Sequence, residues 1–259
     1  MYLEGVTVSV GYGDFLRHTL DHNRHHFDDF VVVTSKDDEE TMQVCADFDV
    51  TCHPTNEFFE LDGKTTPFTK GRGVNAGLAC LERGRWTVNL DADIVLPPDF
   101  RFIVDRLEQQ GVMKEYRIYG ADRLMCPSYD AWMRCSTADL RDKFSAKLDM
   151  FPVGHRLIHN PKLEVAHDGY VPIGYFQMWH RKSSQEMWYL DEHTKTERSD
   201  SAFARQWVRW QRHLLAEFAV IHLESEPSPI GTNWWGRKTK RFGPNIVVKT
   251  IDKTERPVG

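Results

Sequence analysis

The sequence predicts an α/β protein in which a mostly parallel central sheet is flanked by helices within a single domain. Short, continuous apolar runs such as FVVV at residues 30–33 are typical of strands that are buried on both faces. Residues 1–110 alternate such runs with helical patterns, which favours β-α-β units. The chain has 259 residues, of which 41% are hydrophobic and 27% charged, so it can bury a substantial core.

Strands and helices are expected to alternate up to residue 110. The strands are expected where β-branched and other apolar residues run together, at residues 6–10, 30–33 and 86–90. The helices are expected at residues 15–27, 37–48, 73–81 and 100–110. Residues 50–69 are expected to be irregular because they contain Pro54, Gly63 and Pro67.

After residue 110 the pattern changes. Strands are expected at residues 117–120, 174–179 and 219–223, and a polar loop is expected at residues 182–200. The clearest helix is expected at residues 201–218, where apolar side chains recur at helical spacing: Phe203, Trp207, Trp210, Leu214 and Phe218. The chain contains no internal repeat and no long low-complexity segment, so we do not expect independent domains.

Charge and composition exclude several classes of protein. The formal net charge of −5 excludes a uniformly basic protein that coats DNA, although residues 236–256 carry seven Lys or Arg against two acidic residues. No apolar run approaches the roughly 18 residues that span a bilayer, so no transmembrane segment is expected. Residues 1–5 show no signal-peptide pattern, and the five cysteines are an odd number without regular spacing. We therefore expect a reduced, cytoplasmic location.

Two carboxylates follow the strand expected at residues 86–90. Asp91 and Asp93 flank Ala92, and side chains two apart on an extended chain point the same way. Ligands of open α/β sheets gather outside the carboxyl ends of the strands. Paired carboxylates in that position offer hard oxygen ligands for Mg²⁺ or Mn²⁺. The alternative is a turn with two solvated aspartates, and the spacing alone leaves both interpretations open.

The sequence LDAD at residues 90–93 resembles the DxD motif of GT-A glycosyltransferases, which use nucleotide-sugar donors. Residues 6–12 resemble the segment that holds the nucleotide base in that family, and residues 70–77 (KGRGVNAG) resemble the basic segment before the DxD strand. Residues 174–222 resemble a galactosyltransferase-type C-terminal region. Family members often have adjacent acidic residues there, whereas this chain has ERSD at residues 197–200.

The resemblance, which covers about residues 5–225, implies a GT-A-like fold and a specific activity. The implied activity is that of a hexosyltransferase in class EC 2.4. A metal-dependent enzyme would move a sugar from a nucleotide-diphosphate sugar, expected to be a UDP-sugar, to an acceptor hydroxyl with inversion. Residues 1–110 would form the nucleotide-sugar-binding half of the domain and residues 111–235 the acceptor-binding and catalytic half. Residues 236–259 would form a basic tail.

The same resemblance assigns roles to particular residues. The donor contacts would come from Val10, Gly11, Tyr12, Lys70, Arg72, Asn75 and Asp91. The metal ligands would be Asp91, Asp93 and His222. Because imidazole is a normal ligand for Mn²⁺ but rare for Mg²⁺, His222 favours Mn²⁺. Asp200 would act as the general base on the acceptor hydroxyl, with Glu197 and Asp191 as reserves.

Each assignment has a structural alternative. Asp200 would also suit the N-cap of the helix expected after it, and His222 would also suit a packed strand. Lys70 and Arg72 would suit an exposed helix start. The glycines at positions 71, 73 and 77 nearly match a dinucleotide fingerprint, but no strand leads into them, which disfavours a Rossmann oxidoreductase.

Other clusters of histidine, cysteine and tryptophan have weaker functional interpretations. His18, His22, His25 and His26 have a spacing that can bind zinc, but a polar helix face explains them better. The spacing of Cys45, Cys52 and His53 is irregular for a metal site. The candidates for packing against sugar rings are Trp179, Trp188, Trp234 and Trp235. Residues 233–238 are a candidate for a lid that closes on the donor. The core is expected to contain Trp207 and Trp210.

The acceptor and the enzyme class have alternatives as well. The basic tail suits a glycan, a lipid-linked phosphate or a nucleic acid as acceptor, which includes hydroxylated bases in DNA. A GT-A-like nucleotidyltransferase would need Arg and Lys in a Gly-rich loop directly after the first strand. Here the first basic residue after that strand is Arg17. A sugar- or nucleotide-binding module without catalysis is the third alternative.

Overall fold

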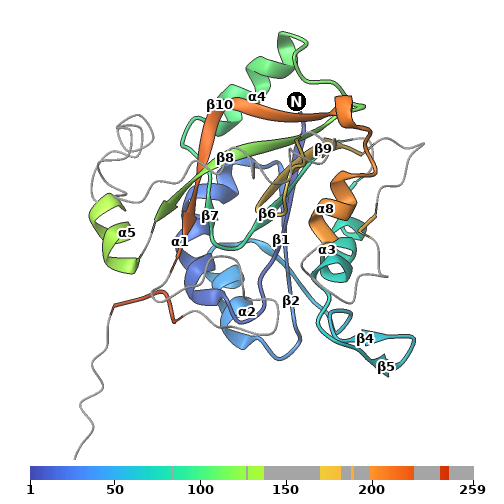
Figure 1. Ribbon diagram of the computed structural model, residues 1–259. Helices are drawn as coiled ribbons and strands as arrows, with labels where there is room; N and C mark the ends of the chain where they lie inside the picture. Colours follow the sequence, from blue (N-terminus) through green and yellow to red (C-terminus); the bar gives the residue numbers. More distant parts are fainter. Residues whose placement is uncertain are drawn as a thin grey trace, which may run out of the picture.

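The protein is described from a computed structural model, which covers residues 1–82, 85–126, 128–136, 170–181, 188–189, 199–224 and 240–244. Strands of the main sheet are β1 (Leu3–Val8), β2 (Asp29–Thr34), β3 (Thr51–Pro54), β6 (Trp86–Asp91), β7 (Ile94–Val95), β8 (Ile118–Cys126), β9 (Phe176–His180) and β10 (Arg212–Leu223). In the described part of the chain this sheet has eight strands in the order β3-β2-β1-β6-β9-β8-β10-β7 (Figure 1).

The sheet is mostly parallel. Strand β9 runs antiparallel to both of its neighbours, β6 and β8, and β7 runs antiparallel to β10. The other neighbours pair in parallel. A small antiparallel hairpin, β4 (Glu60–Leu61) with β5 (Lys64–Thr65), lies outside this sheet. This architecture confirms the α/β fold class with a mostly parallel sheet that the sequence predicts.

Helices cover both faces of the sheet. They are α1 (Gly13–Asn23), α2 (Glu39–Asp47), α3 (Lys70–Ala79), α4 (Phe100–Gln109), α5 (Tyr129–Ser136) and α8 (Ser199–Ala204). Residues of α1, α2 and α4 belong to one buried cluster, and residues of α3 and α8 belong to another. Side chains alternate between the two clusters along β2, because Val32 joins the first whereas Val31 and Val33 join the second. The continuous apolar run at residues 30–33 therefore serves both faces, as the sequence predicts.

The helix predicted at residues 201–218 is wrong over most of its length. Helix α8 ends at Ala204, a 3₁₀ turn spans Arg209–Gln211, and β10 then runs to Leu223. The pairing of β10 with β8 breaks between Leu215 and Ala219, which leaves residues 216–218 outside the regular register. This irregularity interrupts the alternation of buried and exposed side chains along the strand. The apolar residues therefore recur at intervals that are close to those of a helix. Trp210, which the stripe predicted as core, is 62% exposed.

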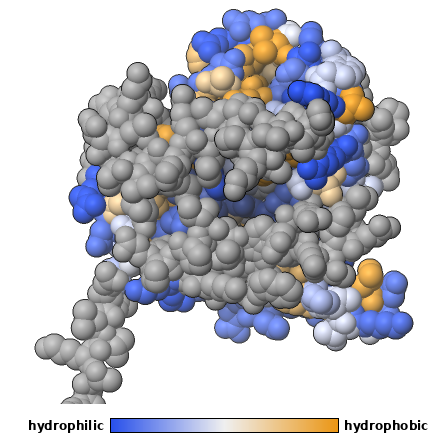
Figure 2. All heavy atoms as spheres, viewed as in Figure 1, coloured by the Kyte–Doolittle hydropathy of each residue, from blue (hydrophilic) through white to orange (hydrophobic). Residues whose placement is uncertain are grey.

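Several predicted features lie outside the described residues. These are the reserve bases Asp191 and Glu197, residues 233–238 with Trp234 and Trp235, and most of the basic tail. Within the described part of the tail, Phe242 is buried and stacks on Phe15 of α1 with ring centroids 4.6 Å apart. Among the described residues, no helix combines the length and the apolar character that crossing a membrane requires. Figure 2 shows hydrophilic and hydrophobic described residues side by side on the face that is turned toward the viewer.

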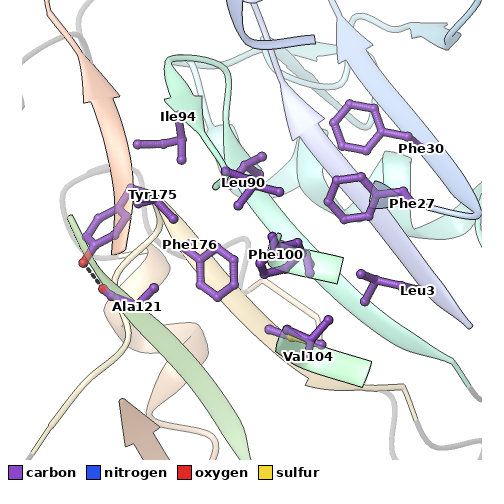
Figure 3. Packing of buried hydrophobic residues seen from close by; sticks show 14 of the residues in the cluster. Leu3, Phe27, Phe30, Leu90, Ile94, Phe100, Val104, Ala121, Tyr175 and Phe176 are labelled. Carbon is purple, nitrogen blue, oxygen red and sulfur yellow. Dashed lines mark hydrogen bonds between the residues drawn. The ribbon is translucent and has the colours of Figure 1, made fainter. Parts of the chain in front are cut away.

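An aromatic core supports the centre of the sheet. Phe100 of α4 is fully buried, and its ring lies 5.9 Å from that of Phe176 and 5.2 Å from that of Phe218. Figure 3 shows Phe100 and Phe176 side by side between Leu90 of β6 and Val104 of α4. Three segments that are distant in sequence therefore depend on one ring cluster.

We expect Phe100→Ala to lower the free energy of unfolding by about 3–5 kcal/mol, because it leaves a cavity between packed rings. The matched control is Phe102→Ala on the same helix, where the ring is 66% exposed. Its expected effect is below about 1 kcal/mol. Urea denaturation followed by circular dichroism measures both. Equal effects for the two variants would contradict this description of α4.

A buried carboxyl group lies on the first strand. Glu4 of β1 is fully buried and accepts a hydrogen bond from the backbone N–H of Glu82 at 2.9 Å. Its other oxygen has no hydrogen-bond partner among the described residues. Burial raises the pKa of Glu4 from 4.5 to about 7. In the folded protein this group therefore stays protonated at pH values where the unfolded chain has released the proton.

We expect this carboxyl group to make the protein less stable as the pH rises from about 5 to 8. The unfolded chain loses the Glu4 proton near pH 4.5 and the folded chain loses it near pH 7, so the stabilisation disappears across that window. The shift corresponds to at most about 3 kcal/mol. Glu4→Gln should flatten this slope, and Glu57→Gln, at an exposed carboxylate, should not. Urea denaturation at a series of pH values checks it, and parallel slopes for Glu4→Gln and the wild type would contradict it.

Candidate active site

Charged side chains meet where the carboxyl end of β6 approaches the start of α3. Asp91 is the last residue of β6, and Lys70, the first residue of α3, donates a hydrogen bond from Nζ to Asp91 Oδ1. Burial, together with Asp93 and Asp200, raises the pKa of Asp91 to about 6, although Lys70 opposes this shift. Burial alone would lower the pKa of Lys70, but the charges of Asp91, Asp200 and Asp93 raise it above its usual value. One ammonium group therefore faces several carboxylates.

Helix α1 fixes the turn that carries the two aspartates. Thr19 Oγ1 donates to the carbonyl of Ala92 at 2.8 Å. Asn23 Nδ2 donates to the carbonyl of Ile94 at 2.7 Å, and its Oδ1 accepts from the N–H of Leu96 at 2.8 Å. Both side chains are buried, so these bonds are shielded from water. The backbone around Asp91 and Asp93 is therefore held on a rigid element.

Asp93 contacts the last strand of the sheet. Its Oδ2 lies 3.2 Å from Nε2 of His222, and Nδ1 of His222 lies 2.9 Å from a guanidinium nitrogen of Arg123 on β8. Burial would raise the pKa of Asp93, but His222 and Lys70 hold it below its usual value. The structure thus brings together two of the predicted metal ligands, Asp93 and His222, and adds Arg123 to them.

Asp200 lies in the first turn of α8, packed against the loop before β9. A Cβ atom on Gly174 would fall 2.0 Å from Asp200 Oδ2, so this close approach requires glycine. Gln177 of β9 donates to the backbone carbonyl of Asp200 at 3.0 Å. The Oδ1 atom of Asp200 is buried and has no hydrogen-bond partner among the described residues. Helix α8 starts at Ser199, so Asp200 lies inside the helix and is not the N-cap.

Asn75 connects α3 to Tyr189. Its side chain donates to the carbonyl of Tyr189 at 2.8 Å and accepts from the N–H of Tyr189 at 2.9 Å. The Tyr189 hydroxyl donates to Gln177 and accepts from Asn89 of β6, and its ring stacks on Phe203 with centroids 4.1 Å apart. In this structure Asn75 therefore bonds to the protein, and its predicted contact with a nucleotide stays a prediction.

Arg72 is occupied in a similar way. Its guanidinium group donates to the carbonyl of Glu60 at 2.9 Å and to the hydroxyl of Thr69 at 2.9 Å. The side chain is buried, so it ties the β4–β5 hairpin and the residues before α3 to that helix. The predicted role of Arg72 in binding the donor stays a prediction. Lys70, two positions earlier, faces the carboxylates instead.

The loop after β1 contains the other predicted donor contacts, Val10, Gly11 and Tyr12. Gly11 has a positive φ of 68°, a conformation that favours glycine, and its N–H donates to Asp38 Oδ2 at 2.6 Å. Asp38 also caps α2 by accepting from the N–H of Thr41 at 3.1 Å. Tyr12 stacks on Phe15. The loop is therefore anchored at Gly11, while its predicted contact with a base stays a prediction.

The carboxylates fit a hard divalent cation, although they do not form a ready cage. Among the described residues, no three side chains of His, Cys, Asp or Glu converge as a metal site. However, Asp93 Oδ1 is buried without a hydrogen-bond partner among those residues. Asp91 carries a raised pKa, which a nearby cation would lower. These oxygen donors are the type that Mg²⁺ and Mn²⁺ prefer.

Several of the remaining histidines and tryptophans serve packing. His22 and His18 make edge contacts with the rings of Trp132 and Tyr129, and His26 is buried. The polar helix face predicted for this histidine cluster is thus partly an aromatic contact surface. Trp179 is 1% exposed and packs against Phe203, so its ring belongs to the core in this structure.

Sequence reasoning missed Arg123, Tyr189 and Asn89. Arg123 lies in the part of β8 beyond residue 120, where the sequence predicted no strand. An arginine among buried strand residues is a detectable signal, because arginine is rarely buried without a partner. Asn89, in the middle of an apolar strand, gives the same kind of signal. Tyr189 lies in a region predicted as a polar loop, and its sequence context gave no comparable indication.

Comparisons with known proteins give a fold but no family. No protein-family model matches the sequence, and no curated protein matches it. The structure is similar to glucosyl-3-phosphoglycerate synthase from Mycobacterium tuberculosis in complex with Mn²⁺ and UDP-glucose, with a TM-score of 0.50 and 13% identity, over 85% of this chain and 71% of that chain. A complex of that synthase with Mn²⁺, UDP and glucosyl-3-phosphoglycerate gives a TM-score of 0.49 and 11% identity, over the same shares of the two chains.

The first of these similarities extends over most of both chains and concerns the fold alone. The GT-A-like fold that the resemblance in the sequence implies is therefore confirmed, and the chain has the α/β fold of a GT-A-type glycosyltransferase.

Proposed function

We propose that this protein is a metal-dependent glycosyltransferase that uses a nucleotide-diphosphate sugar, with a UDP-sugar as the expected donor. The observation that carries the proposal is the group of Asp91, Asp93, Asp200 and Lys70 at the carboxyl end of β6. Ligands of open α/β sheets bind at this edge. The fold is shared with an enzyme that was crystallised with Mn²⁺ and UDP-glucose, which supports the same donor class here.

We assign the metal to Asp91 and Asp93, with His222 next to them. A bound Mn²⁺ or Mg²⁺ would supply positive charge that stabilises the departing nucleoside diphosphate. Lys70 compensates the charge of Asp91 in the protein without donor, so it keeps this carboxylate in place at the end of β6. The buried turn held by Thr19 and Asn23 restricts the motion of both aspartates.

We assign the general base to Asp200. Its Oδ1 atom has no hydrogen-bond partner among the described residues, so it is available to accept a proton from an acceptor hydroxyl. Gly174 and Gln177 hold the residue in place from the loop and from β9. A carboxylate base that acts on the acceptor corresponds to single displacement and inversion at the anomeric carbon. The hexosyltransferase type, the inverting outcome and the cytoplasmic location stay predictions.

The acceptor is proposed only as a molecule with a free hydroxyl group. The similar M. tuberculosis enzyme is named for a glucosyl-3-phosphoglycerate product, which suggests an anionic acceptor as one class to test. The basic residues of the tail favour the same charge class, which includes lipid-linked phosphates and nucleic acids. Glycans without charge form the other class.

Incubation with a panel of UDP- and GDP-sugars and Mn²⁺ tests the proposal. We expect slow release of free nucleoside diphosphate from one donor, and we expect Asp93→Ala to reduce it at least about 100-fold, since the charge supplied by a metal is worth several kcal/mol. Asp99→Ala, at a nearby exposed carboxylate before α4, is the matched control. Release of pyrophosphate would instead identify a nucleotidyltransferase, and binding without turnover a sugar-binding module.

Asp200→Asn tests the role of the general base independently of donor binding. We expect transfer to the acceptor to fall about 100- to 10,000-fold, because the amide cannot accept the proton. The dissociation constant for UDP with Mn²⁺, measured by calorimetry, should stay within about threefold, because the change is isosteric. The control is Asp130→Asn, the same change at an acidic residue in the first turn of another helix, α5. Normal transfer by Asp200→Asn would require another base.

A further inference from the structure

The hydrogen bonds of His222 have a defined direction. An arginine side chain carries only donors and stays protonated in proteins. The guanidinium nitrogen of Arg123 lies 2.9 Å from Nδ1 of His222, so Nδ1 must accept this bond with its lone pair. The proton of the neutral ring then resides on Nε2, which lies 3.2 Å from Oδ2 of Asp93 and donates to it.

The opposite ring orientation does not satisfy these contacts. Turning the imidazole over would bring two carbon atoms to Arg123 and Asp93 in place of the two nitrogens. Arg123 is itself held, because its guanidinium carbon lies 4.7 Å from the centre of the Tyr175 ring and its side chain is buried. Tyr175 in turn donates its hydroxyl proton to the carbonyl of Ala121 (Figure 3).

This arrangement conflicts with the use of Nε2 as a metal ligand. A neutral histidine that binds a metal through Nε2 carries its proton on Nδ1 and donates it to an acceptor such as a carboxylate or a carbonyl. Here the group at Nδ1 is the donor Arg123. The free oxygen is instead Oδ1 of Asp93, which is buried and has no hydrogen-bond partner among the described residues.

We propose that Arg123 and His222 are positioning residues, which orient Asp93 so that its Oδ1 faces the cation, and that the protein binds this cation through aspartate oxygens alone. The inference rests on the proposed function for the presence of the metal, but the tautomer of His222 does not depend on it. With oxygen ligands only, the site loses the preference for Mn²⁺ over Mg²⁺ that an imidazole ligand would impose.

The tautomer is measured in the metal-free protein. Long-range ¹⁵N–¹H correlation spectra of protein labelled at histidine distinguish a ring protonated at Nε2 from one protonated at Nδ1. We expect the Nε2–H form for His222, and a mixture of both forms in Arg123→Met. A wild-type ring protonated at Nδ1 would overturn the proposal, and this measurement needs no stable variant.

The ligand set is measured with Mn²⁺ alone. We expect electron spin echo modulation spectra of the Mn²⁺-loaded protein to lack a coupling to ¹⁴N of histidine. His222→Ala should weaken Mn²⁺ binding about tenfold, the usual cost of a lost outer partner. His222→Gln should stay within about threefold of the wild type, since its amide can donate to Asp93 and accept from Arg123. His213→Gln on the same strand is the control.

The outcomes separate this inference from the proposed function. A ¹⁴N coupling that disappears in His222→Gln would make His222 a ligand and overturn the inference, while the glycosyltransferase proposal would stand. Equal loss of Mn²⁺ binding in His222→Gln and His222→Ala would overturn it too. If the wild type binds no Mn²⁺ and releases no nucleoside diphosphate, the proposed function fails, and with it the role of Asp93 Oδ1 toward a cation.

Discussion

The crowding of negative charge at the end of β6 is the constraint on which the rest of the site depends. Two like charges about 4 Å apart repel by about 4 kcal/mol at an effective dielectric constant near 20. Asp91, Asp93 and Asp200 all act on Lys70, so positive charge at this position has a large stabilising effect. A protein keeps such an arrangement only if other contacts hold the carboxylates in place, and here buried hydrogen bonds from α1 and a glycine contact provide them.

The fold explains why these groups meet. Parallel strands β1 and β6 end at the same edge of the sheet. The first turns of α3 and α8 reach that edge from the face on which these two helices share a buried cluster. The antiparallel strand β9 brings the Gly174 loop to the same place, because β9 begins where β6 ends. Strand β10 adds His222 through its pairing with β7, which directly follows the two aspartates. Several segments of the chain thus contribute to one small region.

Local patterns predicted β1, β2 and β6 and the helices around them, but they missed β3, because residues 50–69 were expected to be irregular. Pairing with distant segments determined the rest of what they missed. Buried strands such as residues 30–33 have a clear apolar signature. The placement of Asp91 and Asp93 at the edge of the sheet follows from their position directly after a predicted strand. The prediction of a helix at residues 201–218 failed because apolar spacing cannot distinguish a helix from an irregular strand whose partner, β8, lies about 95 residues earlier. The contacts of Arg123 and Asn75 depend on segments more than about 95 residues away, which no local window contains.

The irregularity in β10 has a consequence for how this strand tolerates changes in length. Residues 216–218 have no counterpart on β8, because Leu215 and Ala219 pair with adjacent residues of that strand. They form an insertion in a ladder that resumes in register after them. Loss of all three would leave a continuous strand in which His222 keeps its partner on β8 and the face it occupies. Evolution can therefore remove this insertion without displacing that histidine, because the pairs that follow it fix its position.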